Sequence, residues 1–237
     1  MKNLVTDTSS SVCSVGLFED DKLIVKNELD NGKTHSENFM PLVEKTLNDA
    51  NMKLDDLDYI TVVVGPGSFT GIRIGVSSCK AFSDSLNIPC VGISSLEVLA
   101  YNIQNDGIIC STIDCKNNNC YFALYELNSG NYNVLIEPCA KSVNDVLDLL
   151  NSQYYNKCIS FVGDGIPSEK LHSIYDNNAD SEVTKNIISS YLNVENLGTA
   201  GYKKFINNKK IGEEILPLYL KKPQAQIQLE EKLKAKI

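Results

Sequence analysis

The sequence predicts an α/β protein of two related lobes, each with a mixed β-sheet flanked by helices. Patterns typical of strand, strand, strand, helix, strand and helix follow one another through the first part of the chain, and the same order then begins again. The spacings also agree. Asp7 lies 29 residues before the predicted helix cap Ser36, and Asp114 lies 28 residues before the predicted cap Ser142. Matched order and matched spacing together favour an internal duplication.

We therefore divide the chain into an N-terminal lobe over 1–103, a C-terminal lobe over 104–223 and a charged tail over 224–237. In such an architecture a ligand would lie in the cleft between the lobes. The alternative is that a common meander recurs by chance, and it explains the matched spacings less well.

The N-terminal lobe contains eight predicted elements. Alternating apolar residues indicate a strand at the N-terminus and strands over 12–18 and 23–29. A helix over 36–51 follows, with Ser36 as its N-cap. Next we expect a strand over 59–64, a helix over 68–86, a strand over 90–93 and a short helix capped by Ser94 or Ser95.

The second unit repeats this order from about residue 106. Two turns divide residues 106–139 into three strands, and the second of these turns reads Asn-Ser-Gly-Asn. A helix capped by Ser142 follows, and a strand over 158–163 ends in a glycine turn.

Composition restricts the function classes. The 237 residues carry a net charge of −8, and a protein that grips nucleic acid directly usually has a basic face. Residues 203–237 are nonetheless basic, with nine Lys and four Glu, which leaves −13 for the rest. This segment either touches an acidic partner or RNA, or is a solvated and partly helical tail, and we favour the second interpretation. Eight cysteines without a Cys-x-x-Cys pair, no signal peptide and no membrane-length apolar run predict a soluble cytoplasmic protein.

The stretch "GPGSFTG" at 65–71 resembles a phosphate loop but fails both common templates. The P-loop needs a glycine where Thr70 stands, and it needs a lysine that is absent. The dinucleotide fingerprint fits Gly65 and Gly67, but its third glycine comes one place late, at Gly71. A phosphate at the start of the following helix stays open as a generic property of helix N-termini.

Two aspartates are the best acidic candidates. Two-lobed ATPases place an Asp and glycines in the loop after the first strand, and this chain has "DTSSS" at 7–11 and "DCKNNN" at 114–119, without the glycines. A weak nucleotide cleft formed by Asp7, Thr8, Ser9 and Asp114 therefore stays open, beside the interpretation that the aspartates form turns. We expect no tightly bound cofactor.

Metal and acid–base chemistry have little support. The chain has only two histidines, His35 and His172, and they do not form a zinc pair. We interpret His35, which precedes a helix, as a capping or packing residue. We expect no metal site and no catalytic residue in this chain.

The helix over 68–86 is better suited to a protein contact. A glycine inside a helix costs about 1 kcal/mol relative to alanine, so Gly71 and Gly75 suggest the close approach of another helix. The alternative is an internal core. The predicted partner interface joins this helix to the helix over 36–51 and consists of Phe39, Leu42, Val43, Leu47, Phe69, Gly71, Ile72, Gly75, Val76 and Cys79.

Four segments carry a resemblance to a known family. They are "LVTDTSSSVCSVGLF", "THSENFMPLVEKTL", "VVVGPGSFTGIRIGVSSCKAFSDSLNIPCVGISSLEVLA" and "LPLYLKKPQAQ". They resemble the TsaB (YeaZ) family of the glycoprotease-related, TsaD-like superfamily. This family is the bacterial partner of TsaD in making N6-threonylcarbamoyladenosine at position 37 of tRNAs that read ANN codons. The resemblance is strong over 1–100 and diffuse beyond.

The resemblance implies a duplicated actin/Hsp70/sugar-kinase-like (ribonuclease-H-like) fold. It also implies a noncatalytic but required subunit that binds TsaD through its first two long helices and forms a homodimer through the same surface when alone. TsaE, an ATPase, joins the pair, tRNA is contacted only through the complex, and ATP or ADP binds at most at the level of the complex. Family members often have Asp-Ala-Arg where this chain has Asp114-Cys115-Lys116. The rival hypothesis is a sugar-kinase-like enzyme that hydrolyses ATP with Asp7 and Asp114.

Overall fold

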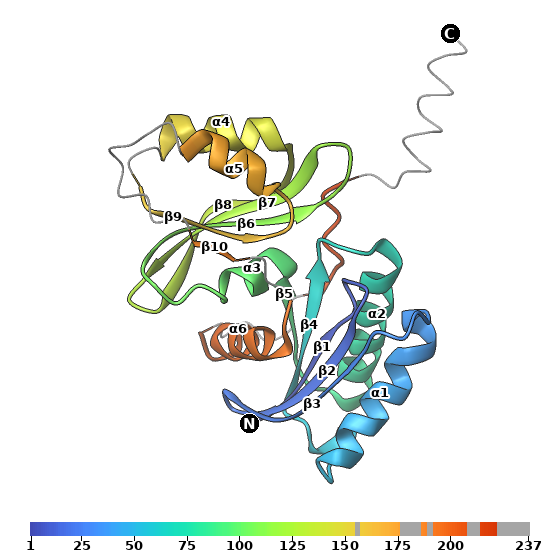
Figure 1. Cartoon of the computed structure of the whole chain (residues 1–237). Coiled ribbons are helices and arrows are strands. Elements are labelled where there is room, and N and C mark those ends of the chain that lie inside the picture. Colours follow the sequence, from blue (N-terminus) through green and yellow to red (C-terminus); the bar gives the residue numbers. More distant parts are fainter. Residues whose placement is uncertain (155–156, 176–185, 189–191, 208–213, 222–237) are drawn as a thin grey trace, which may run out of the picture.

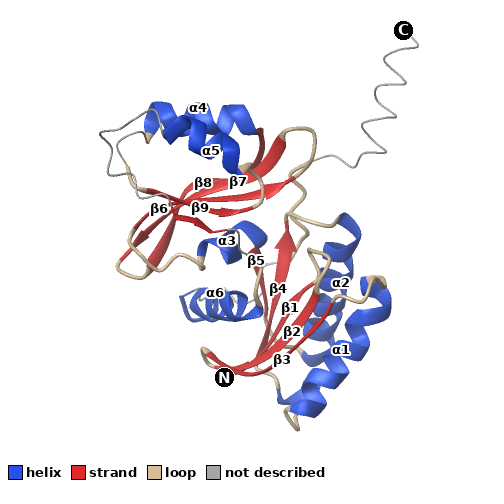
Figure 2. Cartoon of the chain, viewed as in Figure 1, coloured by secondary structure: helices blue, strands red, loops and turns tan. Residues whose placement is uncertain are grey.

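A computed structural model of the chain describes residues 1–154, 157–175, 186–188, 192–207 and 214–221. It contains two five-stranded mixed sheets with helices on their faces (Figures 1 and 2). The predicted charged tail over 224–237 lies outside the described residues.

The first sheet has the strand order β3-β2-β1-β4-β5. Its two hairpin pairs are antiparallel, and β4 pairs in parallel with both β1 and β5. The strands are β1 (Lys2–Asp7), β2 (Cys13–Glu19), β3 (Lys22–Leu29), β4 (Tyr59–Gly65) and β5 (Cys90–Ser94). These bounds agree with the predicted strands to within about one residue.

Two long helices, α1 (His35–Asp49) and α2 (Phe69–Leu86), cover one face of this sheet (Figure 1). A single 3₁₀ turn, η1 (Leu54–Asp56), leads from α1 to β4. The N-cap of α1 is Thr34, which corrects the predicted cap Ser36. Glu37 explains the difference, because its carboxylate accepts the Thr34 backbone N–H at 3.1 Å and closes a capping box.

The other face of the first sheet is covered by α3 (Ser95–Ala100) and α6 (Val194–Asn207). Val5 and Val63 of the sheet pack there against Leu197. The short helix α3 also packs against the second sheet, so it lies between the two lobes (Figure 1).

The second sheet has the order β10-β9-β6-β7-β8, which is the order of the first sheet with each strand replaced by its counterpart. Two helices, α4 (Val143–Gln153) and α5 (Ser168–Tyr175), lie on its outer side (Figure 1). The strands are β6 (Gly107–Asp114), β7 (Asn119–Asn128), β8 (Asn131–Ser142), β9 (Ile159–Gly163) and β10 (Asn186–Ile188). The predicted duplicated, actin-like fold is thereby confirmed.

One segment lies in a different lobe from the one predicted. Helix α6 packs on the first sheet, where the Phe205 ring stacks on Tyr59 with centroids 4.0 Å apart. Its glycines make this approach close, since a Cβ on Gly198 would lie 2.3 Å from Phe18. The predicted second lobe over 104–223 is therefore wrong for α6, whose partner strands lie far away in sequence.

Candidate partner-binding surface

The glycine stretch after β4 holds the loop that follows β1. The Ser68 N–H donates to the Ser9 carbonyl oxygen at 2.7 Å, and Thr8 Oγ1 donates to the Gly71 carbonyl oxygen at 2.7 Å. A Cβ on Gly71 would lie 1.9 Å from the Thr8 carbonyl oxygen, and one on Gly75 would lie 2.4 Å from Thr8 Oγ1. These glycines make room for the chain's own loop, which corrects the interpretation that they make room for another helix.

The start of α2 uses its own donors internally. Besides the Ser68 N–H, the Gly71 N–H donates to Ser68 Oγ at 3.2 Å. The residues predicted for a nucleotide cleft in this lobe, Asp7, Thr8 and Ser9, are all buried. Asp7 Oδ1 accepts the Ser9 N–H at 2.7 Å, and burial raises the pKa of the Asp7 carboxyl above its ordinary value. These contacts favour the turn-forming role of Asp7.

Asp114 ends the corresponding strand of the other lobe. Its carboxylate accepts the Lys116 ammonium at 2.7 Å and the Lys116 N–H at 2.9 Å, and these bonds lower the pKa of Asp114. The glycine device recurs here, since a Cβ on Gly163 would lie 1.9 Å from the Thr112 carbonyl oxygen. The nucleotide cleft stays a prediction.

His35 joins α1 to the loop after β1. Its Nε2 lies 2.7 Å from the Ser10 carbonyl oxygen, and its ring lies against Gly71. This supports the packing role. The His172 side chain lies outside what the structure describes. Within the described ranges, no group of three or more His, Cys, Asp or Glu side chains is placed to hold a metal ion.

The side chains predicted to form the partner interface mostly face the interior. Phe69 is partly exposed, and the other nine are buried: Phe39, Leu42, Val43, Leu47, Gly71, Ile72, Gly75, Val76 and Cys79. Each helix turns its apolar stripe toward its own sheet. This corrects the set of residues, because buried side chains do not meet a partner directly; of the nine, only Phe39 also lines the groove between the helices. A contact through the helices themselves stays a prediction.

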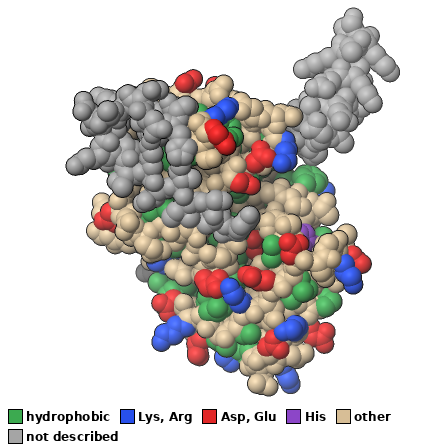
Figure 3. Space-filling view, in the orientation of Figure 1, with side chains coloured by type: hydrophobic (Ala, Val, Ile, Leu, Met, Phe, Trp, Pro, Cys, Tyr) green, Lys and Arg blue, Asp and Glu red, His purple; other side chains and the backbone are tan. Residues whose placement is uncertain are grey.

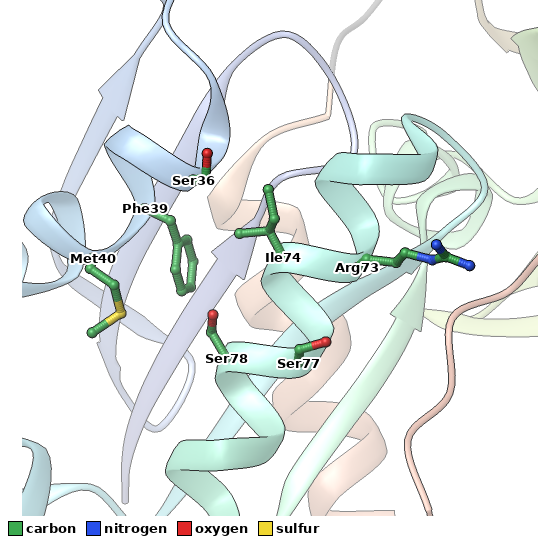
Figure 4. Close-up of a pocket in the computed structure, with 7 residues that line it drawn as sticks. All are labelled: Ser36, Phe39, Met40, Arg73, Ile74, Ser77 and Ser78. Atoms are coloured by element: carbon green, nitrogen blue, oxygen red, sulfur yellow. The ribbon is translucent and has the colours of Figure 1, made fainter.

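The outer side of the two helices forms an open groove with a volume of about 420 Å³ (Figure 4). Figure 4 shows Phe39 and Ile74 facing one another between the helices, while Arg73 extends away from α1. Met40 is 50% exposed at the edge. The lining residues are Ser36, Phe39, Met40, Arg73, Ile74, Ser77 and Ser78. The groove is therefore apolar and hydroxyl-lined, with Arg73 as its one charged lining residue.

An extended segment over 214–221, here named the C-terminal strap, borders α2 on its other side. The Leu218 N–H donates to the Val64 carbonyl oxygen at 2.7 Å, and Glu214 pairs with Lys80 at 3.1 Å. At the far end, the Lys221 ammonium donates to the Cys115 carbonyl oxygen at 3.0 Å. The strap thus connects both lobes.

Sequence reasoning missed the place of the strap. Two of its side chains, Leu216 and Tyr219, are 62% and 42% exposed, and the Tyr219 ring lies against Phe69 of α2. The "LPLYL" run was a signal of an extended segment, but nothing local indicates which strand or helix it lies against.

Comparison with known proteins identifies the family. A family model for "TsaD: tRNA N6-adenosine threonylcarbamoyltransferase" matches residues 29–229. A Bacillus subtilis protein named "tRNA threonylcarbamoyladenosine biosynthesis protein TsaB" is 35% identical over 164 residues, which are 69% of this chain and 71% of the relative. The chain belongs to the TsaB family. An Escherichia coli TsaB is 30% identical over 129 residues, which span 53% of this chain and 55% of that protein.

Solved structures support the fold of this TsaB-family chain. A Pseudomonas aeruginosa protein with similarity to peptidase YEAZ has a TM-score of 0.73 at 23% identity and covers 93% of this chain and 99% of its own. YeaZ from Pseudomonas aeruginosa has a TM-score of 0.70 at 21% identity, with 92% and 99% covered. At these identities the likeness concerns the fold alone.

The surface of this TsaB-family chain has no broad area of one charge in the view of Figure 3, where acidic and basic side chains are intermixed. No helix among the described residues is both long and apolar enough to cross a membrane. The groove, with its apolar floor and few charges, differs from this mixed surface and is the best candidate for a protein contact.

Proposed function

We propose that the chain is a noncatalytic but required subunit of the complex that transfers a threonylcarbamoyl group to N6 of adenosine 37 in tRNAs that read ANN codons. The names of its curated relatives, as threonylcarbamoyladenosine biosynthesis proteins, support this role. The noncatalytic role in this proposal is supported by one observation: the loop after β1 packs against the glycine stretch at 65–71. The chain's own Thr8 and Ser9 occupy the space beside the start of α2, where a phosphate would otherwise lie.

The partner in this proposal is TsaD, the catalytic subunit, which binds across α1 and α2. The groove offers an apolar floor at Phe39 and Ile74, and Met40 is an adaptable side chain at its edge. A partner helix laid in such a groove would bury this area with ordinary helix packing. When TsaD is absent, a second copy of the chain covers the same surface. TsaE joins the pair, tRNA is reached only through the complex, and ATP or ADP acts at that level, in the cytoplasm.

The rival function, an enzyme that hydrolyses ATP with Asp7 and Asp114, has less support. A group that binds a nucleotide metal or activates water must reach solvent, and Asp7 is only 4% exposed. Its carboxylate is also used by the Ser9 N–H. ATP turnover by the purified chain that is lost in Asp7→Asn would favour this rival.

Copurification with TsaD tests the proposal. Met40→Asp and Ile74→Asp each place a carboxylate in the apolar groove, where an unpaired charge costs several kcal/mol. We expect the affinity of both variants for TsaD to fall by about a hundredfold or more. Ile24→Asp makes the same chemical change at an exposed position on β3, outside the groove lining, and should bind normally. Ile72→Asp and Val76→Asp are unsuitable probes, because both positions are buried in the core. Ile74 is partly buried against the same core, so Ile74→Asp counts as a probe only if its circular dichroism spectrum and midpoint match those of the wild-type chain.

Reconstitution tests the activity. TsaD, TsaE, threonylcarbamoyl-AMP and tRNA are mixed with and without the chain, and modified adenosine is measured by mass spectrometry. The proposal expects modification only with the wild-type chain or with Ile24→Asp. Modification without the chain, or full activity of the groove variants, would contradict it.

A further inference from the structure

Arg73 is unusual in the composition of this chain. Of the 22 Lys and Arg residues, it is the single arginine. Everywhere else the chain uses lysine for positive charge, including the exposed face of the same helix at Lys80. A single arginine in so lysine-rich a chain indicates a position where the planar guanidinium group does something that an ammonium group cannot.

Two aromatic rings hold this guanidinium. Its Cζ lies 3.9 Å from the centroid of the Phe69 ring and 5.5 Å from that of Tyr219. Its Nε donates to the Tyr219 hydroxyl at 2.7 Å. The rings are 4.8 Å apart, so strap and helix meet at this point. Stacking on a ring face and a bond from Nε both need the planar group, which explains why lysine is not used.

The outer edge of the guanidinium is unused. Among the residues that the structure describes, the two terminal nitrogens of Arg73 have no acceptor, and Arg73 forms no ion pair. Lys80, two turns further along α2, is paired with Glu214 at 3.1 Å. Figure 4 shows the Arg73 side chain extending outward from α2. A charged fork that is already held in one orientation loses little conformational freedom on binding.

We propose that Arg73 binds a carboxylate of the protein that docks on α1 and α2, with both terminal nitrogens donating to its two oxygens. This inference rests on the proposed function and deepens it by adding a specificity determinant. Charge complementarity supports a protein carboxylate as the occupant. The groove beside Arg73 offers no other charged lining residue, so this pair fixes the register of an otherwise apolar contact.

The Arg73 guanidinium also explains how a chain with a negative net charge can bind a carboxylate of another protein. With a net charge of −8, most of the surface repels carboxylates at long range. A single guanidinium, held by Phe69 and Tyr219 on the side of α2 that faces away from α1, restricts the attractive point to one place. The partner in this proposal therefore carries an Asp or Glu that reaches past the groove and over α2, where it meets Arg73.

Affinity measurements on the full chain with TsaD test this. Arg73→Gln should weaken binding by about tenfold or more. Arg73→Lys should weaken binding nearly as much, because a lysine makes no bidentate pair with a carboxylate. Lys80→Gln removes a charge from the same helix that is already paired, and it should change the affinity by less than about threefold. Wild-type binding should weaken with salt more steeply than that of Arg73→Gln.

Tyr219→Phe distinguishes binding of the partner by Arg73 from a purely structural role of Arg73 in holding the strap. It removes the hydroxyl that accepts from Nε but keeps the ring and the charge, so it should cost less affinity than Arg73→Gln. If the two lose equally, Arg73 only holds the strap and the inference is overturned. Equal losses in Arg73→Gln and Lys80→Gln would overturn it as well.

The partner's carboxylate is found by replacing each surface Asp and Glu of TsaD with its amide. One replacement should weaken binding to the wild-type chain but not to Arg73→Gln. If no replacement does so, or if Arg73→Gln matters only when ADP is added, the ligand is not a protein carboxylate. A wild-type chain that does not bind TsaD at all would instead overturn the proposed function.

Discussion

Gly71→Ala separates two roles for the glycines of α2 by the sign of its effect. If Gly71 makes room for a helix of another protein, alanine would stabilise the free chain by about 1 kcal/mol, because alanine is the better helix former. If it makes room for the loop after β1, as the structure indicates, alanine must displace that loop.

The magnitude follows from the contacts. The new methyl carbon would lie 1.9 Å from the Thr8 carbonyl oxygen, a backbone atom, so the loop has to shift. The shift would disturb two hydrogen bonds, from Thr8 Oγ1 to Gly71 and from Ser68 to Ser9, each contributing about 1 kcal/mol. Overpacking adds about 1–3 kcal/mol, and the gain in helix propensity returns about 1 kcal/mol. We expect a net loss of about 3 kcal/mol, or a Tm lower by about 6–12 °C.

Urea unfolding followed by circular dichroism gives the free energy, and a thermal melt gives the midpoint. Ser77→Ala, at an exposed position on the same helix, is the matched control and should stay within about 0.5 kcal/mol of wild type. A Gly71→Ala variant with an unchanged or higher midpoint would refute the packing role and favour a partner helix at this position.

Two further predictions concern α6 and Asp7. Phe205→Ala should lower the free energy of unfolding by about 2–3 kcal/mol, because the Phe205 ring stacks on Tyr59. Ile206→Ala, at an exposed position, should lower it by less than about 0.5 kcal/mol. Equal losses in urea unfolding would contradict the packing of α6 on the first sheet. Asp7→Asn should raise the midpoint at pH 7, because burial raises the pKa of Asp7 in the native state and makes its charged form costly, while the amide oxygen can still accept the Ser9 N–H. This advantage should shrink as the pH falls through the raised pKa and should be lost below 3.8, the ordinary value, where the wild-type carboxyl becomes protonated in both states. A difference between the two melts that does not change with pH would contradict it.

The periodic parts of the chain were predictable. The strands and the two long helices follow from alternation and from apolar spacing, which are local properties. The same spacing does not indicate whether an apolar stripe packs on the chain's own sheet or on a partner protein. Phe39, Ile72 and Val76 form a stripe equally suited to a partner or to the chain's own sheet, and they lie in the core. The groove between the helices, which Phe39 also lines, can be recognised only once the helices are placed.

The missed parts depend on contacts between distant segments. Helix α6 has a regular pattern, but its place on the first sheet depends on Phe18 and Tyr59, far away in sequence. The strap lies beside α2 through Tyr219 and Arg73, which are 146 residues apart. The cap of α1 was a local error, since Glu37 three residues after Thr34 was a visible capping-box signal.

The two lobes share closely packed glycines at the end of the fourth strand, but their helices differ in length. In each lobe, a glycine after the fourth strand lies tightly against the end of the first strand or the loop that follows it: Gly71 in the first lobe and Gly165 in the second. Yet α2 has 18 residues, whereas its counterpart α5 has eight, and α1 has 15 against 11 in α4. A groove that accepts several turns of a partner helix needs two long neighbours, and among the described residues these are α1 and α2 of the first lobe. The strap runs along that lobe and brings Tyr219 against Arg73. Duplication therefore explains the fold, whereas the proposed partner contact depends on the two long helices of the first lobe.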